Sequence, residues 1–350
     1  MSDYLTENKE RNKKGEFDKT DVLSVSGDYG IVNQIELLGR SFAGASVLPY
    51  HVVRHGNIVY TKSPLKEYPY GIVKANTGVD GIVSTLYAVY NIKNNVDAQF
   101  IEYYFSSANR TNRYFKPIVR IGAKHDMKIG NQEVLANKVT FPNLEEQTKI
   151  ASLFRFLDKR IATQNKIIDK LQSLIKGIRN KLFENDKDWR KAKIREFLCI
   201  GNGKDYKHLD IGDIPVYGTG GKMLSVNDFL YDGDSVCIGR KGTIDTPLFL
   251  TGKFWTVDTL FYTYGFKDVL PKFCYYLFKQ INWQLYNEGT GVPSLSKSTI
   301  ENIKVRIPSI VQQYKICYIL DSYEDKIKNE GLILDLYCSQ KQYLLRQMFV

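Results

Sequence analysis

Few residues in this sequence have the types and spacing that catalysis requires. A methyltransferase acting on an adenine or cytosine amino group is expected to carry an Asp/Asn-Pro-Pro-aromatic loop, but none of the ten prolines adjoins another. A phosphate-binding P-loop needs Gly-Lys followed by Ser or Thr, whereas Gly-Lys is followed here by Asp205, Met223 and Phe254. The sequence therefore predicts no methyl transfer and no P-loop ATP binding by this chain.

Two histidines and two glycine-rich stretches are the other candidates for a metal or phosphate site. His51 and His55 are four residues apart, which would suit a metal on a helix. The valines between them and the Gly-Asn after them indicate a strand and a turn, so we expect two unrelated histidines. The stretches 218–221 and 289–291 are interpreted as turns, with phosphate contact as the less favoured alternative, because neither has the dinucleotide-binding spacing. No Ser, Cys or carboxylate is recognisable as a nucleophile paired with a base.

Basic residues in two hairpin-like segments offer a different chemistry, which is contact with a polyanion. Residues 56–63 include Lys62, and residues 233–242 include Arg240 and Lys241. Arginine can bind guanine through two hydrogen bonds, and lysine can neutralise phosphate. A single surface lysine is more often part of a solvated turn. Two such segments in a chain with 49 basic and 38 acidic residues, a net charge of +11, make DNA contact a competitive interpretation.

These segments need a scaffold, and its strongest signal is a long helix at residues 144–183. Alternate steps of four and three from Ile150 reach ten positions, of which nine are apolar and the tenth is Gln164. An apolar repeat of 3.5 residues with no internal proline is typical of a coiled coil. The 39 residues from 145 to 183 would form a helix roughly 58 Å long. The seam of this helix includes Ile150, Phe154, Leu157, Ile161, Ile168 and Leu171.

The same helix recurs 166 residues later. That offset carries Pro142 to Pro308 and Gln147 to Gln313 without a gap. A fixed internal period predicts the order unit, helix, unit, helix. The second seam contains Lys341, which we expect to be tolerated near a fraying helix end. The apolar positions of this seam include Ile316, Leu320, Ile327 and Leu334.

Two units rich in predicted strands precede the helices. Residues 1–18 are polar and charged and predict a loose arm, and the strand-like pattern of the first unit begins at Asp21. Short apolar runs separated by Gly, Pro, Asn and Asp predict strands in both units. The predicted strands are 22–25, 51–53, 58–61, 70–73, 82–90, 214–217, 235–238, 248–250, 254–257 and 260–264, and the predicted short helices are 100–107, 131–136 and 272–278.

The second unit opens with residues 189–203, which have no counterpart before Asp21. The first unit is therefore predicted to lack an opening strand or two. The hinge after the first helix, residues 184–188, can span only about 20 Å and cannot lead the chain back along a helix of roughly 58 Å. We therefore expect the two helices to run antiparallel.

Composition and chain termini indicate the compartment. Five cysteines without a Cys-X-X-Cys pair predict reduced thiols in a cytoplasmic protein. The N-terminal residues have no apolar core of the kind that a signal peptide requires. No apolar run approaches 18 residues, so no membrane span is predicted.

The chain resembles the DNA specificity subunits of type I restriction-modification enzymes. In that family two target-recognition domains are each followed by a long helix that opens with proline, an acidic-Gln pair and Ile. Here Gln312 departs from the pattern by replacing the acidic residue of the second copy. The residues that carry the resemblance are Pro142, Glu146, Gln147 and Ile150 in the first copy, Pro308, Gln313 and Ile316 in the second, and the segments 22–26, 81–84, 233–242 and 295–297.

The resemblance covers nearly the whole chain and implies an α+β fold. Two duplicated, sheet-rich target-recognition domains would be separated by two long antiparallel coiled-coil helices with pseudo-twofold symmetry. The expected boundaries are residues 1–144 for the first domain, with a shortened N-terminal part, 145–184 for the first helix, 185–310 for the second domain and 311–350 for the second helix.

The function that the resemblance implies is that of a non-catalytic subunit. Each domain would read one half of a bipartite double-stranded DNA target, while the helices set the spacer and dock two methyltransferase subunits. Restriction motor-nuclease subunits would join through the methyltransferases. S-adenosylmethionine, ATP and Mg would act in those partners, with no cofactor or metal in this chain. The expected DNA contacts are Lys62, Ser63, Lys66, Arg120, Lys124, Thr219, Lys222, Arg240, Lys241 and Lys297.

Two alternatives remain open from the sequence. In one, the chain is a non-DNA coiled-coil scaffold whose helices recruit partners and whose basic surface aids solubility. A binding titration separates this from DNA recognition, which weakens steeply with salt. In the other, the chain is a self-sufficient nuclease or methyltransferase, which the missing motifs oppose.

Overall fold

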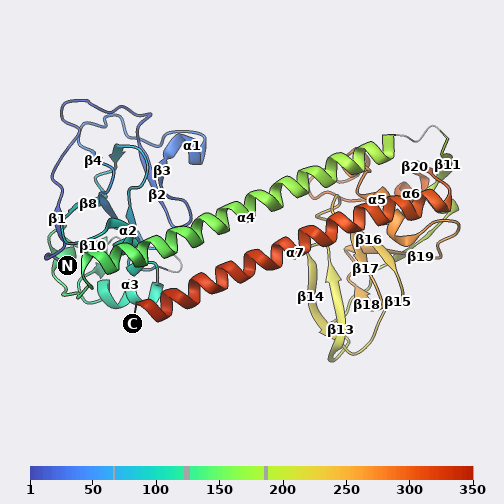
Figure 1. The fold of residues 1–350 in the computed structure, drawn as a ribbon. Helices are drawn as coiled ribbons and strands as arrows, with labels where there is room; N and C mark the ends of the chain where they lie inside the picture. Colours follow the sequence, from blue (N-terminus) through green and yellow to red (C-terminus); the bar gives the residue numbers. More distant parts are fainter. Residues whose placement is uncertain (66–67, 122–126, 185–187, 350) are drawn as a thin grey trace. The chain divides into compact units, whose positions relative to one another are not determined.

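The computed structural model describes residues 1–65, 68–121, 127–184 and 188–349 (Figure 1). The chain forms two compact units: unit 1 comprises Met1–Gln164 and Ile333–Val350, and unit 2 comprises Asn165–Leu332. The long helices α4 (Leu144–Glu184) and α7 (Ile310–Met348) each contribute residues to both units. The fold is α+β, as the resemblance implied, and it contains the two long helices that the duplicated apolar repeat predicted.

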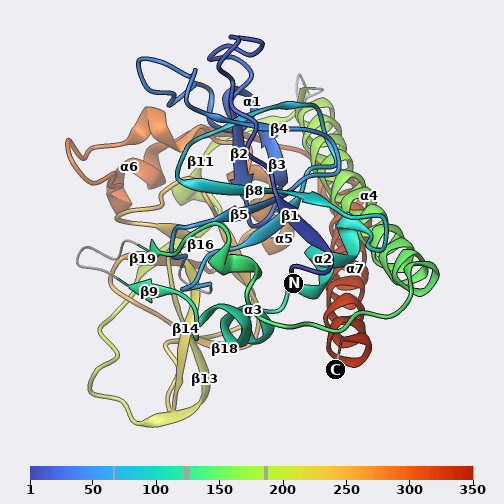
Figure 2. The same ribbon diagram turned by 90° about the vertical axis from the view of Figure 1, so that its left-hand side faces the viewer.

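Unit 1 contains a four-stranded antiparallel sheet with the order β1-β8-β5-β6 (Figure 2). One face of this sheet packs into the main core of the unit, in which Tyr60, Phe100 and Phe115 are fully buried. The bounds of its strands and of the helices near it are β1 (Leu5–Glu7), β5 (Ile58–Thr61), β6 (Val73–Ala75), β8 (Tyr87–Ile92), α2 (Ala98–Tyr104) and α3 (Ala108–Phe115).

A second layer of strands in unit 1 is made of two antiparallel pairs, β2-β3 and β4-β7. A parallel bridge between Val22 and Ile82 joins them into the order β3-β2-β7-β4. The bounds of these and the remaining short elements are β2 (Leu23–Ser26), β3 (Gly30–Asn33), α1 (Gln34–Leu38), β4 (His51–Val53), β7 (Gly81–Val83), β9 (Arg120–Ile121), β10 (Met127–Lys128) and η2 (Glu133–Leu135).

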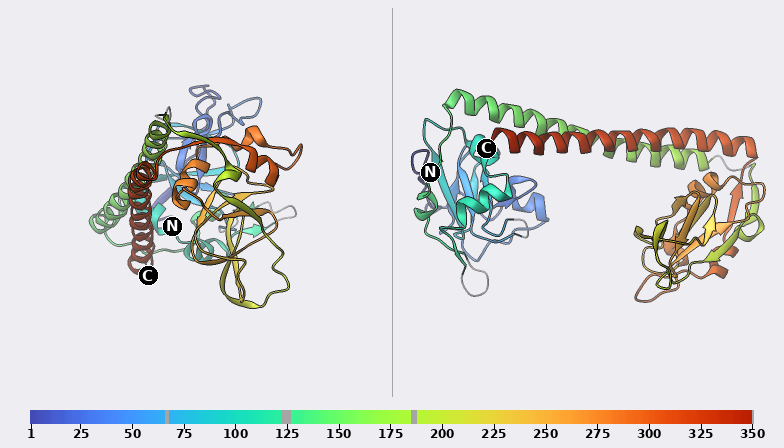
Figure 3. Two further views of the ribbon diagram at one scale, coloured as in Figure 1. Left: turned by 90° about the vertical axis from the view of Figure 1, so that its right-hand side faces the viewer. Right: turned by 90° about the horizontal axis from the view of Figure 1, so that it is seen from below.

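Unit 2 repeats this architecture strand by strand. Its strands are drawn in yellow-green to orange in Figure 3. Its first sheet has the order β12-β19-β16-β17 and is antiparallel throughout, like β1-β8-β5-β6. Its second sheet has the order β14-β13-β18-β15 with a parallel β13-β18 pair, like β3-β2-β7-β4. The bounds are β12 (Cys199–Asn202), β13 (Ile211–Gly218), β14 (Gly221–Val226), β15 (Tyr231–Asp232), β16 (Ser235–Gly239), β17 (Leu248–Leu250), β18 (Lys253–Thr256), β19 (Leu260–Tyr264), α5 (Pro271–Phe278), η4 (Trp283–Tyr286) and α6 (Lys297–Asn302).

Unit 2 also has a two-stranded antiparallel ribbon formed by β11 (Arg190–Lys193) and β20 (Lys304–Ile307). The short helix η3 (Ile194–Glu196) follows β11. Within the described residues of unit 1, no strand pair corresponds to this ribbon. The ribbon is therefore the main structural difference between the two copies.

The N-terminal segment is ordered, so the predicted loose arm was wrong. Met1 and Leu5 are only 3% and 4% exposed and belong to the main core of unit 1. Strand β1 occupies the edge position that β12 occupies in unit 2. Unit 1 therefore has the counterpart of β12 that the sequence did not reveal, whereas the β11-β20 ribbon has no counterpart among its described residues.

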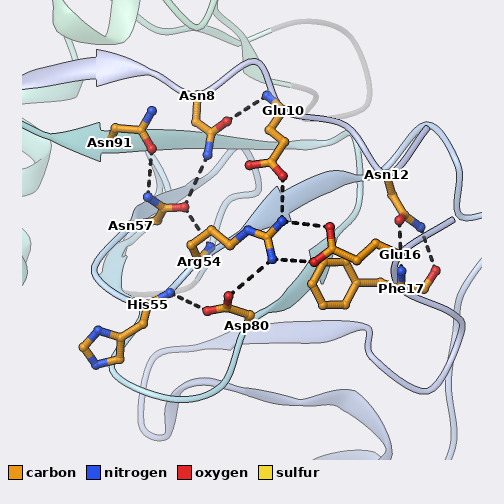
Figure 4. A network of polar contacts seen from close by, with 10 residues as sticks. All are labelled: Asn8, Glu10, Asn12, Glu16, Phe17, Arg54, His55, Asn57, Asp80 and Asn91. Carbon is orange, nitrogen blue, oxygen red and sulfur yellow. Dashed lines mark hydrogen bonds and ion pairs between the residues drawn. The ribbon is translucent and has the colours of Figure 1, made fainter. Parts of the chain in front are cut away.

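A polar network fastens the rest of this segment (Figure 4). The Arg54 guanidinium lies 2.7 Å from carboxylate oxygens of both Glu10 and Glu16 and 3.4 Å from Asp80, and it covers the Phe17 ring at 5.3 Å. The hydrogen bonds that Arg54 donates to Glu16, Glu10 and Asp80 raise the pKa of its guanidinium. Because all four side chains are partly exposed, each pair stabilises the unit only modestly, and the network acts mainly by joining charged residues that sequence reasoning assigned to solvent.

The long helices run antiparallel within unit 1. Phe154 of α4 stacks on Phe349 at 5.9 Å, Asp158 is ion-paired with Lys341, and Arg160 lies over the Tyr337 ring at 5.9 Å. Residue numbers rise along α4 while those of its partners fall along α7. Lys341 is thus held by an ion pair and lies 5.7 Å from the Tyr103 ring, so the expectation that it sits at a fraying end was wrong.

The predicted seam positions are buried or half-buried along both helices. Phe154, Leu157, Ile316 and Leu320 are buried. The other positions named above for the two seams are half-buried: Ile150, Ile161, Ile168, Leu171, Ile327 and Leu334. None of the helices within the described residues has the length and hydropathy that crossing a membrane needs.

Each long helix is tied to its unit by a buried glutamine in its first turn. Gln147 accepts a hydrogen bond from the Asp97 backbone N–H at 3.1 Å and donates to the carbonyls of Asn95 at 3.1 Å and Pro142 at 2.8 Å. Its side chain therefore joins the start of α4 to the N-cap of α2.

Gln313 makes the same three bonds in unit 2. It accepts from the Leu270 N–H at 2.8 Å and donates to Asp268 at 3.2 Å and Pro308 at 3.0 Å. Both glutamines have no solvent exposure. The Pro-to-Gln spacing recognised in the sequence is thus a device that fixes the helix start against the preceding unit.

Candidate nucleic-acid interface

The turn after β16 presents the strongest group of exposed cations among the predicted contacts. Arg240 and Lys241 are exposed, and the Arg240 guanidinium lies 5.9 Å from the Phe261 ring centre. The backbone N–H of Arg240 donates to the Thr259 carbonyl at 2.8 Å, and the Arg240 carbonyl accepts from the Leu295 N–H at 2.9 Å. The backbone is therefore fixed while the side chains project into solvent.

Glycines on both sides of these cations allow the turn to form. A Cβ at Gly239 would collide with the Thr243 carbonyl oxygen, and Gly242 has a φ of +87°. The Gly242 N–H donates to the Pro293 carbonyl at 2.9 Å. Because other residues would collide at Gly239 and be strained at Gly242, the Gly-Arg-Lys-Gly sequence is needed to hold the two cations at this position.

Other predicted contacts of unit 2 gather around this turn. A Cβ placed on Gly242 would lie 3.8 Å from the Thr219 hydroxyl, so the tip of the β13-β14 hairpin adjoins it. Lys222 is exposed on the same hairpin. Lys297 follows the Leu295 segment bonded to Arg240 and forms an ion pair with Glu301 at 3.7 Å. The structure thus brings five predicted residues from three segments to one surface.

The loop before this surface is a turn, as interpreted from its glycines. The Asn287 side-chain oxygen accepts from the N–H groups of Gly289 and Ser294, both at 2.9 Å. A backbone bond from the Glu288 N–H to the Ser294 carbonyl closes the loop at 2.9 Å. This arrangement supports the 293–295 segment on which the Arg240 turn rests.

In unit 1, Lys62 follows β5, the strand equivalent to β16, but its side chain is engaged. The Lys62 ammonium donates to the Asn131 side-chain oxygen at 2.6 Å, and the Asn131 amide donates to Glu7 at 2.8 Å. Gln132 also donates to Glu7 at 3.0 Å. Burial lowers the pKa of Lys62, and Glu7 partly opposes this effect. Lys62 is therefore part of a polar chain rather than a free cation.

The carboxylate of Glu7 is the acidic end of that chain. Partial burial acts to raise its pKa, but the hydrogen bonds from Asn131 and Gln132 outweigh burial and lower it. Glu7 and Asn131 were missed from the sequence because they are 124 residues apart. The sequence offered one signal for Asn131: the offset of 166 residues relates it to Lys297, which was a predicted DNA contact.

The remaining predicted DNA contacts of unit 1 are not part of the hydrogen-bonded series Lys62–Asn131–Glu7 in the described structure. Ser63 is exposed beside Lys62, and Arg120 is exposed on the short strand β9. Lys66 and Lys124 lie outside the described residues. Among the residues that the structure describes, unit 1 consequently brings together fewer of the predicted cations than unit 2.

The two histidines occupy unrelated positions. His51 lies on β4 with 1% exposure, its Nδ1 atom has no hydrogen-bond partner within the described residues, and burial lowers its pKa to about 4. His55 is exposed, and its backbone N–H donates to Asp80 at 2.7 Å. No cluster of three or more His, Cys, Asp or Glu suited to a metal ion occurs in the described parts of the chain.

Comparison with known proteins begins with the family. Residues 186–335 match the model of the type I restriction modification DNA specificity domain. A putative type I restriction enzyme specificity subunit of Haemophilus influenzae, S.HindORF215P, is 25% identical over 286 residues, which are 73% of this chain and 72% of the relative. The putative MjaX specificity subunit of Methanocaldococcus jannaschii is 24% identical over 286 residues, 67% of this chain and 63% of the relative.

Two solved structures share the fold. The type I restriction-modification S subunit from M. genitalium has a TM-score of 0.63 at 16% identity, with 99% of this chain and 94% of that chain covered. A chain from a structure on complex assembly of the type I R-M system has a TM-score of 0.61 at 12% identity and covers 99% and 95%.

The duplicated sheets, each followed by a long helix, are the fold that this chain shares with these two structures. Residues 186–335 are thus similar to the DNA specificity domain of type I restriction modification enzymes, and the chain as a whole is similar to a putative specificity subunit of such an enzyme.

Proposed function

We propose that this chain supplies the DNA sequence specificity of a type I restriction-modification complex, with each unit reading one half of a bipartite duplex target. The observation that carries the proposal is the duplication: both units have the same strand orders, and in both the turn after the equivalent strand, β5 or β16, carries a predicted contact. Two equivalent readers in one chain fit two half-sites in one target.

The two readers would use different chemistry. In unit 2, Arg240 would contact a guanine edge and Lys241 a phosphate. The backbone of their turn is already fixed by Thr259 and Leu295, so little conformational entropy is lost on binding. In unit 1, Lys62, Asn131 and Glu7 form a chain of donors and acceptors of the kind that reads base edges.

The long helices would set the unread spacer and bind the catalytic partners. Each helix is continuous across the boundary between the units, and its start is fixed by a glutamine. Large apolar side chains remain exposed on them, among them Phe156 on α4 and Tyr318 and Leu336 on α7. Exposed apolar groups on helices fit helical segments of partner subunits.

The catalytic chemistry belongs to those partners. Two methyltransferase subunits would bind S-adenosylmethionine and modify adenine, and motor-nuclease subunits joined through them would use ATP and Mg. This chain would contribute the recognition surfaces and the spacing. The matching domain model and the Haemophilus influenzae relative are described as belonging to specificity subunits, which supports this division of roles.

A domain exchange tests the proposal. Residues 185–310 are replaced by the corresponding domain of another such subunit, and modified adenines are mapped in cells that carry the matching methyltransferase. We expect one half-site to change and the other to stay the same. A change in both half-sites, or in neither, would reject the assignment of one reader to each unit.

A DNA titration separates the proposal from a scaffold role. Binding of the reconstituted complex to its mapped target should weaken steeply as salt rises, because phosphate contacts release counterions. Binding that is absent at low salt would favour the scaffold.

An insertion tests the spacer role. Four residues are added to α4 after Gln164 and four to α7 after Leu332, the points where the units divide. We expect active variants to recognise the same half-sites with a longer spacer. An unchanged spacer would exclude the helices as its determinant.

A further inference from the structure

The loop that supports the Arg240 turn carries an acidic side chain that the recognition surface described above does not include. Glu288 is exposed, and its backbone N–H donates to the Ser294 carbonyl at 2.9 Å. Ser294 in turn forms an antiparallel bridge with Lys241. The next residue, Leu295, donates its N–H to the Arg240 carbonyl at 2.9 Å. Glu288 therefore belongs to the surface on which the exposed cations of unit 2 lie.

Two hydroxyl groups hold the Glu288 side chain. Its Oε1 atom accepts a hydrogen bond from the Ser296 hydroxyl at 2.9 Å and another from the Thr299 hydroxyl. These bonds, that from Thr299 first, lower the pKa of Glu288, so its carboxylate is ionised at neutral pH. Within the described residues, the Oε2 atom has no hydrogen-bond partner and Glu288 forms no ion pair. One oxygen is thus anchored, and the other can accept from a ligand.

The backbone around Glu288 is also fixed. The Asn287 side-chain oxygen accepts from the N–H groups of Gly289 and Ser294, both at 2.9 Å. A Cβ at Gly289 would lie 2.1 Å from the Val292 carbonyl oxygen, so a larger residue would collide with the backbone there. A side chain held on a fixed backbone loses little conformational entropy on binding, which favours a role in recognition.

Unit 1 holds an acid against the equivalent segment. The offset of 166 residues relates residues 131–132 to residues 297–298. In unit 1 the side-chain amides of 131–132 donate to Glu7 at 2.8 and 3.0 Å. In unit 2 the hydroxyls that flank 297–298 donate to Glu288. Glu7 precedes the β5 turn in sequence, whereas Glu288 follows the β16 turn, so duplication alone does not account for an acid at both places. A requirement that the two readers share does.

We propose that Glu288 is a base-reading residue of unit 2, which accepts a hydrogen bond from the exocyclic amino group of cytosine or adenine in the major groove. This role rests on the proposed DNA reading by unit 2 and adds a second base contact to it. Only cytosine N4 and adenine N6 present an amino donor in that groove, and carboxylates accept from such groups. The carboxylate also repels DNA phosphate, so a sequence that lacks the amino donor is bound less well.

The competing role is structural, because Glu288 also supports the start of α6, whose N-cap is Ser296. Glu288→Gln distinguishes the two roles. The amide oxygen of Gln can keep the bonds to both hydroxyls, while an NH2 donor replaces the second carboxylate oxygen. The melting temperature should therefore change little, and the base preference should change at one position of the half-site.

The test uses the reconstituted complex and duplexes with the target mapped for the wild-type chain. Each cytosine or adenine in the half-site read by unit 2 is replaced in turn by an analogue without the amino group, 2-pyrimidinone or purine. At one position the wild type should lose affinity by roughly tenfold or more, whereas Glu288→Gln should bind both duplexes about equally. The analogue that gives this difference shows whether cytosine or adenine is read.

The matched control is Glu301→Gln, which removes the same charge from α6 itself. It should change affinity for all duplexes by a similar factor and keep the wild-type response to the analogues. If Glu288→Gln responds to every analogue as the wild type does, or weakens all duplexes equally, Glu288 is only structural and DNA reading by unit 2 still stands. A wild-type complex without base preference in that half-site would overturn both the role of Glu288 and the proposed function.

Discussion

The turns after β5 and β16 occupy the same position in two equivalent sheets, yet they hold their cations differently. In unit 1, Lys62 is half-buried and bonded to Asn131, which is bonded to Glu7. In unit 2, Arg240 and Lys241 are exposed on a turn fixed through its backbone alone. The duplicated fold thus keeps the predicted DNA contact at the same turn in both units. The neighbouring side chains determine whether that turn carries exposed cations, as in unit 2, or a hydrogen-bonded lysine, as in unit 1.

The glutamine in the first turn of each long helix is where the two copies agree most closely, and its removal should give the largest effect. Gln147→Leu and Gln313→Leu each leave buried backbone groups without partners, so each should lower the free energy of unfolding by about 2 to 3 kcal/mol. Chemical denaturation of the full chain, with hydrogen exchange to resolve the units, measures this. A large loss from one variant and none from the other would break the equivalence.

A second prediction is that the stability of unit 1, which contains His51, depends on pH between 7 and 5 more strongly than that of unit 2. The folded pKa of His51 is about 4, below its ordinary value of 6.5, so its neutral form is favoured in the fold. The stability that it contributes is complete above pH 6.5 and is lost as the pH falls from there toward 4. Between pH 7 and pH 5, unit 1 should lose about 2 kcal/mol.

Hydrogen exchange at both pH values measures that loss in unit 1 and unit 2 separately. His51→Gln is the control, since it removes the titrating group and should flatten the dependence in unit 1. Equal acid sensitivity of wild type and variant would assign the loss to other residues.

Arg240→Ala should weaken DNA binding by about 1.5 kcal/mol, within the range for a bidentate contact to guanine. The change should be confined to the half-site read by unit 2. Titration with targets altered in one half-site at a time measures this effect. Unaltered affinity at physiological salt would assign Arg240 to a purely structural turn.

Lys62→Ala should weaken DNA binding by less than about 1 kcal/mol, because its ammonium is already bonded within the protein. Its salt dependence should also change little, since a lysine held by Asn131 is less available to neutralise phosphate. A loss as large as that of Arg240→Ala would show that the two turns are equivalent in chemistry as well as in position.

The sequence predicted the features that depend on local periodicity and missed those that depend on distant pairing. The 3.5-residue apolar repeat located both long helices, and alternating apolar runs located most strands of the sheets. Strand β1 was missed because its short apolar pattern, Met1 and Leu5, lies within a charged segment. Only the fold brings Arg54 to Glu10 and Glu16 and so shows why that segment is ordered.

The residues of the candidate DNA interface were also predictable where they depend on local sequence and not where they depend on distant pairing. Arg240 and Lys241 were recognisable because the glycines around them mark a turn. The hydrogen bond from Lys62 to Asn131 was not recognisable, because these residues are 69 positions apart in the sequence. The segment at 131–136 was expected to be a helix, and it forms only the short 3-10 helix η2 at Glu133–Leu135, just after Asn131.

The hydrogen bonds of Gln147 and Gln313 also fix the rotation of each long helix about its own axis. Since Gln147 and Gln313 each hold the first turn of a helix against its own unit, neither helix can turn about its axis without breaking three hydrogen bonds. Each residue added to a helix lengthens it and also rotates the C-terminal part of the helix by about 100°, whereas seven added residues shift the phase by only about 20°. Changes in helix length during evolution should therefore favour whole heptads, so the spacer lengths open to such a protein form a discrete set.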